Sequence, residues 1–269
     1  MKKFLKAAAL SATVLALAAC GNDDEEKLVI GAAAGLHDIV LEQAKPILAE
    51  EGIELEIKPY TEYVMPNQDL ESGDLDANYF QHAPYLAAQI ADHGYDFVSV
   101  GGVHVEPMGI YSSKYDSVDE IPDGGTIIFS NSIPEEGRIL TLLETAGLIK
   151  LKDGVDKVNA KIADIVENPK NLVFDNSSNP EILVQYLNND EGDAIVINAN
   201  FIIDAGLNPS KDSIAVEGPE SAYVNDIVVR SEDKDKESIK KLVEVLQSQE
   251  IQDFINEEWD GTVIPTGGK

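Results

Sequence analysis

Phe80, His82 and Tyr85 fall within six residues of one another, where an expected strand gives way to an expected helix. Pro84 suits the first turn of that helix, because its missing N–H would have no partner there in any case. The helical pattern continues to His93 and ends before a glycine. Open α/β sheets bind ligands at the carboxyl ends of their strands. Two aromatic rings and an imidazole at such a place indicate a wall for a small apolar or thioether side chain.

Arginine is rare in this chain, which has eighteen lysines but only Arg138 and Arg230. Arg138 comes near the start of an expected helix that follows the strand Thr126–Phe129. Its planar guanidinium can bind a carboxylate through two parallel hydrogen bonds, which a lysine cannot reproduce. Backbone N–H groups at the same helix start would add to an anion site. The alternative is a surface arginine paired with Glu135 or Glu136.

Tyr63, Asn198 and Asn225 complete the set of candidate binding residues. Tyr63 extends the aromatic wall, although core packing is the alternative for every aromatic side chain and above all for Phe80. The two asparagines can accept from an ammonium group and donate to a carboxylate. The alternative for Asn198, which directly precedes an expected helix, is an N-cap. For His82 the alternative is a structural hydrogen bond.

The sequence lacks the motifs of several enzyme classes. It contains no Gly-x-Ser-x-Gly element and no Walker A loop, and its single cysteine, Cys20, is near the N-terminus. Its four histidines include no closely spaced pair of the kind that holds zinc. We therefore expect no enzymatic activity, no catalytic residue, no cofactor and no metal site.

The N-terminus has the pattern of a bacterial lipoprotein signal. Three lysines begin it, and the apolar stretch Phe4–Ala19 that follows is too short to cross a membrane core of roughly 30 Å. Small residues then lead to Cys20, as in a lipobox. We expect a signal peptide over 1–19, a diacylglyceryl anchor on Cys20 and a polar tether over 20–26. An ordinary signal peptide with a chance cysteine is the alternative.

The chain is strongly acidic, with a formal net charge of −29 that becomes −32 once three signal-peptide lysines are removed (−29 − 3). Such a body repels phosphate backbones, which excludes nucleic acid as an expected partner. It also disfavours direct contact with an anionic membrane, so the membrane is expected as a partner through the lipid alone.

Short β-type runs alternate with helical patterns, which indicates an α/β fold with parallel strands. Periodicity does not decide between two lobes and one doubly wound sheet. The expected strands are Leu28–Ile30, Leu55–Ile57, Ala77–Phe80, Phe97–Val100, Thr126–Phe129, Leu172–Phe174, Ala194–Ile197 and Tyr223–Val229. The expected helices are Ile39–Leu48 with a bend or restart at Pro46, Pro84–His93, Pro134–Leu143, Pro180–Leu187, one that ends near Ala205, Ile239–Leu246 and Ile251–Asn256.

Several short elements, in order along nearly the whole mature chain, resemble the methionine-binding lipoprotein family (the MetQ/NlpA type). They are Tyr63–Asn67, Leu75–Leu86, His104–Ser112, Gly137-Arg138, Glu167–Lys170, Val196–Asn200 and Ala222–Asn225. Members of that family are the substrate-binding components of methionine ABC importers.

The resemblance implies a two-lobe periplasmic-binding-protein type II fold, in which each lobe is a mixed, mostly parallel sheet flanked by helices. The chain would cross twice, with lobe 1 over 27–110 and 226–269 and lobe 2 over 111–225. It further implies that Arg138 binds the ligand carboxylate, and that Tyr63, Phe80, His82, Tyr85, Asn198 and Asn225 contact the ligand.

The function implied by the resemblance is that of a monomeric, lipid-anchored receptor on the extracytoplasmic face of the cell membrane. It would bind L-methionine and deliver it to a permease driven by an ATPase. Three loops depart from the family pattern: Gly31–Gly35, Ser130–Gly137 and Asp175–Glu181. A methionine-containing dipeptide or another neutral amino acid is therefore an alternative ligand, and a surface adhesin or a metal-binding lipoprotein is the alternative of a different class.

Overall fold

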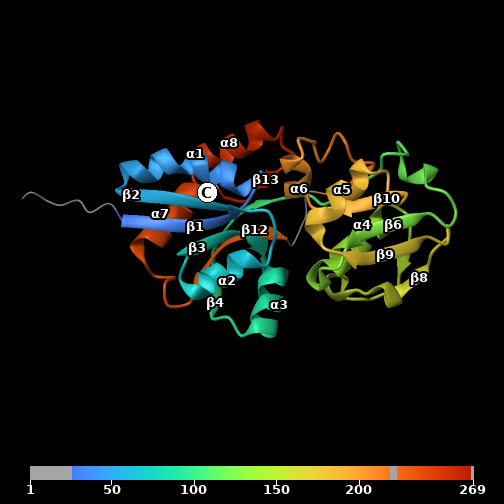
Figure 1. Ribbon diagram of the computed structural model, residues 1–269, viewed down its shortest axis with the longest axis horizontal. Helices are drawn as coiled ribbons and strands as arrows, with labels where there is room; N and C mark the ends of the chain where they lie inside the picture. The colour runs from blue at the N-terminus through green and yellow to red at the C-terminus, as the bar shows by residue number, and fades with distance from the viewer. Residues whose placement is uncertain (1–25, 219–222, 268–269) are drawn as a thin grey trace, which may run out of the picture.

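The computed structural model describes residues 26–218 and 223–267. The expected signal peptide, Cys20 and nearly all of the tether lie outside the described residues. Figure 1 shows two α/β units that lie next to one another along the long axis of the molecule, each built around its own sheet. The fold class predicted from the sequence, a two-lobe α/β architecture, is confirmed.

The larger sheet has six strands, in the order β13-β4-β12-β3-β1-β2. β1 pairs in parallel with β2 and β3, whereas β12 runs antiparallel to both of its neighbours, β3 and β4. β13 also runs antiparallel to its neighbour β4, so four of the six strands, β1 to β4, point the same way. The strands are β1 (Glu26–Ala33), β2 (Ile53–Tyr60), β3 (Ala77–His82), β4 (Phe97–Val105), β12 (Val224–Arg230) and β13 (Ile264–Pro265).

Five helices of the described residues flank this sheet, and their apolar faces form its core. In α1, the buried residues Val40, Leu41, Ala44 and Leu48 recur at helical spacing and pack against the sheet. α7 adds Ile239, Leu242 and Leu246 to the same cluster. The helices are α1 (His37–Glu50), α2 (Met65–Ser72), α3 (Ala83–His93), α7 (Glu237–Leu246) and α8 (Gln249–Glu258).

The smaller sheet has five strands, in the order β11-β5-β10-β6-β9. Only β5 runs against the common direction, because it pairs antiparallel with β10 and β11. The strands are β5 (Gly109–Tyr111), β6 (Thr126–Ser130), β9 (Val173–Ser178), β10 (Ala194–Ile197) and β11 (Ala215–Val216). Its helices are α4 (Glu136–Thr145), α5 (Leu183–Asn188) and α6 (Ala199–Asp204).

Smaller elements complete this half of the chain. β7 (Lys150–Leu151) and β8 (Ile165–Glu167) form a separate antiparallel pair. Short 3-10 helices are η1 (Val118–Glu120), η2 (Ile133–Glu135), η3 (Lys157–Asn159), η4 (Ile162–Asp164) and η5 (Pro180–Ile182).

The chain passes from the larger to the smaller sheet between β4 and β5, and returns between β11 and β12. The predicted lobe boundaries, at 110/111 and 225/226, fall inside β5 and β12. The division of the chain into lobes at those residues stays a prediction.

Local structure differs from the sequence expectation at the first loop and the first helix. Gly31 does not open a loop, because β1 continues to Ala33 in register with β2. A Cβ at Gly31 would lie 2.5 Å from a methyl of Leu75, so any larger residue here would force the Leu75 side chain to move. Helix α1 also runs unbroken through Pro46, which is exposed, so that water can reach the carbonyl whose hydrogen bond is lost.

Two further differences concern α4 and α2. The predicted helix from Pro134 begins instead as the 3-10 turn η2, and α4 starts at Glu136. Helix α2 is not predicted by the sequence pattern, since Leu70 is the one aliphatic side chain that it buries. Among the described residues, no helix is long and apolar enough to cross a membrane.

Candidate functional site

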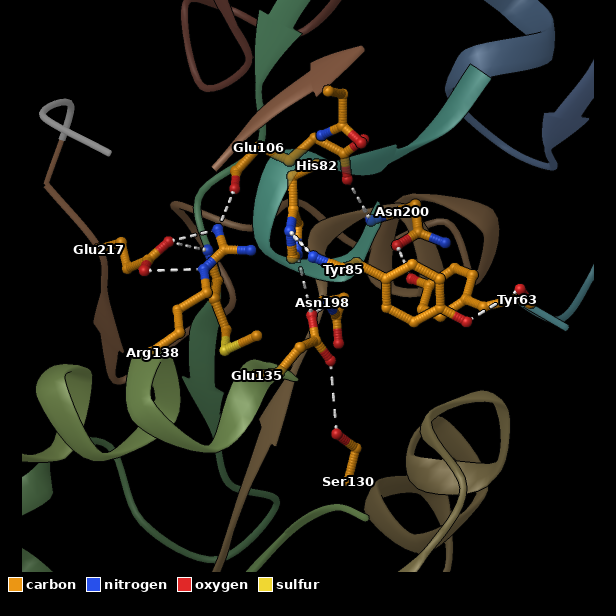
Figure 2. A network of polar contacts seen from close by, with 12 residues as sticks. Tyr63, His82, Tyr85, Glu106, Ser130, Glu135, Arg138, Asn198, Asn200 and Glu217 are labelled. Carbon is orange, nitrogen blue, oxygen red and sulfur yellow. Dashed lines mark hydrogen bonds and ion pairs between the residues drawn. The ribbon is translucent and has the colours of Figure 1, made fainter. Parts of the chain in front are cut away.

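A cavity between the two sheets receives all seven residues that the sequence singled out. Its empty space is about 430 Å³, part of it open to solvent. One side comes from α1, β3, α3 and the loop before α2, and the other from η2, α4 and α6 (Figures 1 and 2). The predicted residues in its lining are Tyr63, Phe80, His82, Tyr85, Arg138, Asn198 and Asn225. Their contact with a ligand stays a prediction.

Three aromatic rings form one wall of the cavity. Every residue of β3 is buried, and Phe80 and His82 share one face of it because strand side chains alternate. Tyr85 follows in the first turn of α3, with its ring centre 5.8 Å from that of Phe80. Tyr63 lies 6.0 Å from Phe80 and 6.3 Å from Tyr85. The hydroxyl of Tyr85 donates to the backbone carbonyl of Tyr63 (3.0 Å), which fixes the two rings relative to one another.

His82 is the N-cap of α3 and also faces the cavity. Its Nδ1 accepts a hydrogen bond of 3.3 Å from the backbone N–H of Tyr85. The ring proton of the neutral tautomer is then assigned to Nε2, which lies 3.8 Å from Oε1 of Glu135. His82 therefore makes a structural hydrogen bond and also lines the cavity.

Arg138 is buried, and its partner is a carboxylate that the sequence did not suggest. The alternative of a surface arginine paired with Glu135 or Glu136 is therefore wrong. Its Nε and Nη2 donate to the two oxygens of Glu217, at 2.9 and 2.6 Å (Figure 2). The second Nη2 proton goes to the backbone carbonyl of Glu106 at 2.7 Å. Burial opposes the charge, but the Glu217 hydrogen bonds outweigh it and raise the pKa of Arg138 above its usual value.

These contacts change what Arg138 can offer to a ligand. The face of its guanidinium lies 4.5 Å from the ring centre of Tyr223. Nη1 has no hydrogen-bond partner among the described residues, and in Figure 2 the remaining guanidinium nitrogen points toward His82. The expected pair of parallel hydrogen bonds is therefore already made within the protein, and Nη1 is left for a further acceptor.

Glu106 lies at the centre of a buried polar cluster. Its Oε1 is 3.1 Å from Nε2 of His37 and 2.9 Å from Nε2 of His104. Its Oε2 accepts from the backbone N–H of Asn200 (3.1 Å), and Asn225 contacts His37 (3.2 Å). Burial alone would raise the pKa of Glu106, but the two histidines and Arg138 more than offset it and lower that pKa to about 2. Burial lowers the pKa of His37 to about 4.

His37, His104 and Glu106 also form a donor set of the type that holds a divalent cation. They come from α1, β4 and the turn after β4, so the sequence spacing did not reveal the set. The same atoms satisfy one another, and Nδ1 of His104 is hydrogen-bonded to the hydroxyl of Tyr79. A cation would have to displace the two imidazole protons that now face Glu106.

Glu135 is a second buried carboxylate in the cavity wall, with fewer partners. Its Oε1 accepts from the side-chain amide of Asn198 at 2.5 Å, and its Oε2 lies 3.4 Å from the hydroxyl of Ser130. Asn198 occupies the N-cap position of α6 without capping it, so its amide is used on Glu135 instead. Burial would raise the pKa of Glu135, but His82, Arg138 and Asn198 reverse that effect and lower it.

Sequence reasoning missed half of the cavity lining. Glu106, Met108 and Asn200 lie inside motifs noted for the family, although none was singled out as a binding residue. His37 had no such signal, and Glu135 was considered only as a surface partner of Arg138. The residues not predicted are His37, Gln81, Glu106, Met108, Glu135, Ala199 and Asn200.

Two α/β units with an aromatic and charged cavity between them are typical of substrate-binding proteins. Comparisons with known proteins give the family. The model of the NlpA lipoprotein family matches residues 28–267. The methionine-binding lipoprotein MetQ of Bacillus subtilis (strain 168) is 43% identical, over 98% of this chain and 99% of its own length.

Solved structures agree with this assignment. A protein of Enterococcus faecalis V583, described as a pheromone cOB1 precursor/lipoprotein of the YaeC family, is 50% identical with a TM-score of 0.88, over 90% of this chain and 100% of its own. A nutrient-binding protein of Burkholderia cenocepacia bound to methionine is 39% identical with a TM-score of 0.83, over 89% of this chain and 99% of its own. The chain belongs to the NlpA lipoprotein family, a family of substrate-binding lipoproteins, and the resemblance noted in the sequence is confirmed.

Proposed function

We propose that this chain is the extracytoplasmic substrate-binding component of an ABC importer and that it binds L-methionine between its two lobes. The observation that carries the proposal is the cavity itself. It combines the rings of Tyr63, Phe80 and Tyr85 with Nη1 of Arg138, for which the described part of the chain supplies no hydrogen-bond partner. A guanidinium suits a carboxylate, and aromatic rings suit a thioether chain. The Burkholderia cenocepacia relative bound to methionine supports this ligand.

Ligand binding would close the two lobes around the amino acid. Closure excludes water from the cavity and strengthens the electrostatic contact between Arg138 and the ligand carboxylate. The closed form then docks on a membrane permease that is driven by a cytoplasmic ATPase. A diacylglyceryl group on Cys20 holds the receptor, a monomer, at the extracytoplasmic face of the cell membrane. Membership of a lipoprotein family supports that anchor.

The test is calorimetry on refolded, ligand-free mature chain, residues 20–269. It is titrated with L-methionine, D-methionine, Gly-Met and a panel of neutral amino acids. Submicromolar binding of L-methionine is the expected result. Tight binding of a dipeptide or another amino acid would keep the receptor and reassign its ligand. Thermal unfolding with zinc or a chelator tests the His37, His104 and Glu106 donor set, and a shift with metal but not with amino acids would replace the proposal.

Arg138→Ala sharpens the test. We expect methionine binding to weaken by about 30-fold to several thousandfold, roughly 2–5 kcal/mol, because the change removes the cationic partner of a buried carboxylate. Arg230→Ala is the matched control, since Arg230 also holds an aspartate (Asp233) but lies outside the cavity lining. Weakening of less than about threefold in Arg138→Ala would remove this residue from the site.

A further inference from the structure

The charged groups around the cavity do not balance. Arg138 is the one lysine or arginine among the described residues that line it. Against it stand the carboxylates of Glu106 and Glu135, which line the cavity, and Glu217, which binds the arginine. Because Glu217 takes two guanidinium nitrogens, its charge and that of Arg138 neutralise one another. Two buried anions remain.

Glu106 has its donors supplied by the protein. His37 and His104 approach one oxygen, and the backbone N–H of Asn200 donates to the other. A carboxylate can accept about four hydrogen bonds. Glu106 accepts two, from His104 and Asn200, and Nε2 of His37, which is also hydrogen-bonded to Asn225, lies 3.1 Å from the same carboxylate. A buried anion with this many donors needs no further cation nearby.

Glu135 has no comparable set of hydrogen-bond donors. Its exposed fraction is 2%, yet it has one short hydrogen bond, from Asn198, and one long one, from Ser130. His82 is 3.8 Å away, beyond hydrogen-bond range, and its Nδ1 is committed as an acceptor to the Tyr85 N–H. A second proton on that ring would break this N-cap. Figure 2 shows Glu135 between His82 and Ser130, with its carboxylate near Asn198.

We propose that Glu135 is the specificity-determining residue that binds the ligand's ammonium group, so that the site requires a free amino group. This rests on the proposed function. Glu135 and Arg138 are three residues apart where η2 leads into α4, a spacing that puts side chains on one face of a helix. The pair can therefore hold the two ends of one α-amino acid, with ammonium on Glu135 and carboxylate on Nη1 of Arg138. The ammonium supplies the positive charge that the cavity lacks.

The two ends of the ligand would then contribute unequally to the binding free energy. The ammonium meets a carboxylate with no strong cationic partner, whereas the ligand carboxylate meets a guanidinium already shared with Glu217. Loss of the amino group should therefore cost more affinity than loss of the carboxylate charge.

Calorimetry on the mature chain tests this with three ligands of similar size. They are L-methionine, L-methioninamide, which lacks the carboxylate charge, and 4-(methylthio)butanoate, which lacks the amino group. Wild-type protein is expected to bind the butanoate at least about 100-fold more weakly than methionine, and the amide only about tenfold more weakly. Glu135→Gln should weaken methionine binding at least about tenfold and change butanoate binding less than about threefold.

Glu136→Gln is the matched control, because Glu136 pairs with Lys161 outside the cavity lining. It should bind all three ligands as the wild type does. Wild-type protein that binds methionine and the butanoate equally well would overturn the assignment of Glu135 and leave the proposed function intact. This comparison needs no variant, so it holds even if Glu135→Gln fails to fold. Folded wild-type protein that binds no amino acid would overturn the proposed function as well, and the two failures are thus distinguishable.

Discussion

Two buried carboxylates, those of Glu106 and Glu135, face the same cavity, but the protein supplies them with different sets of hydrogen-bond donors. Glu106 lies where the chain passes from the larger to the smaller sheet, and it collects donors from α1, β4 and α6. Glu135 lies in η2 and has one short hydrogen bond, from Asn198. A buried carboxylate whose donors come from three elements holds those elements together. A buried carboxylate with positions left open is suited to a partner from outside.

The ionisation state of the two carboxylates does not explain the difference between Glu106 and Glu135. The pKa of each carboxylate is lowered although burial opposes ionisation in both, so both are anions at neutral pH. The number and origin of the donors separate them. The same logic applies to Glu217, whose oxygens are taken by Arg138 and by the backbone N–H of Met108 (2.9 Å). Of the three, Glu135 is the one with the least protein-supplied hydrogen bonding.

The largest effect on stability is expected from Glu106→Gln. An amide nitrogen cannot accept, so it would face one of the buried donors from His37, His104 or Asn200 and leave that donor without a partner. We expect the free energy of unfolding to fall by about 3–5 kcal/mol. Urea unfolding of the ligand-free protein measures it.

Glu135→Gln is the comparison for this change. Its amide oxygen can still accept from Asn198 and its amide nitrogen can donate to Ser130, so the expected loss is below about 1 kcal/mol. Equal losses in the two variants would show that both carboxylates stabilise the fold, and that Glu106 and Glu135 do not differ in role.

Acid sensitivity of the Glu106 cluster should come from His37. Burial lowers its pKa from 6.5 to about 4, so as the pH falls below 6.5 the unfolded chain binds a proton that the folded chain refuses until about pH 4. Stability is therefore lost across that window, by about 3 kcal/mol in all. The depressed pKa of Glu106 acts lower, since its contribution is present above about pH 4.5 and lost toward pH 2.

Unfolding free energies at pH 7.5, 5.5 and 4.5 measure this loss. His37→Gln keeps a donor near Glu106 but cannot titrate, so its stability should depend less on pH in this range. The control is His93→Gln, because His93 is exposed. If the slopes of His37→Gln and wild type coincide, the cluster is not the source of acid sensitivity.

The aromatic wall and the arginine could be predicted because their chemistry is rare in this sequence. With only two arginines in the chain, Arg138 is conspicuous, and Phe80, His82 and Tyr85 mark the end of a strand that the residue pattern predicts. A strand-to-helix connection of this kind lies at the edge of a sheet, where α/β proteins bind their ligands. All seven residues chosen in this way line one cavity.

The carboxylates could not be predicted, because the chain has 49 acidic residues and few of those that the structure describes are buried. Nothing local distinguishes Glu135 from Glu136, yet one faces the cavity and the other forms an ion pair with Lys161. The partner of Arg138 was missed for a related reason. Glu217 is 79 residues away and reaches the arginine only because the chain returns through β11. Contacts at such separations depend on tertiary packing.

A small effect is expected from Tyr63→Phe, and this change tests whether Asn200 supports Glu106 or acts on the ligand. The Tyr63 hydroxyl donates to Oδ1 of Asn200 (2.6 Å), and the Asn200 backbone N–H donates to Glu106. Loss of this hydroxyl should therefore lower the free energy of unfolding by about 1 kcal/mol. Methionine affinity should change less than about threefold, since the ring itself remains.

Tyr85→Phe is the control for this change, because it removes a hydroxyl of the same wall that donates to the Tyr63 carbonyl instead. Calorimetry and urea unfolding of both variants measure the two effects separately. If Tyr63→Phe weakened methionine binding more than about tenfold and left stability unchanged, Asn200 would act on the ligand rather than on Glu106. Asn200 of α6 would then belong with the residues that contact the ligand and not with those that stabilise the fold.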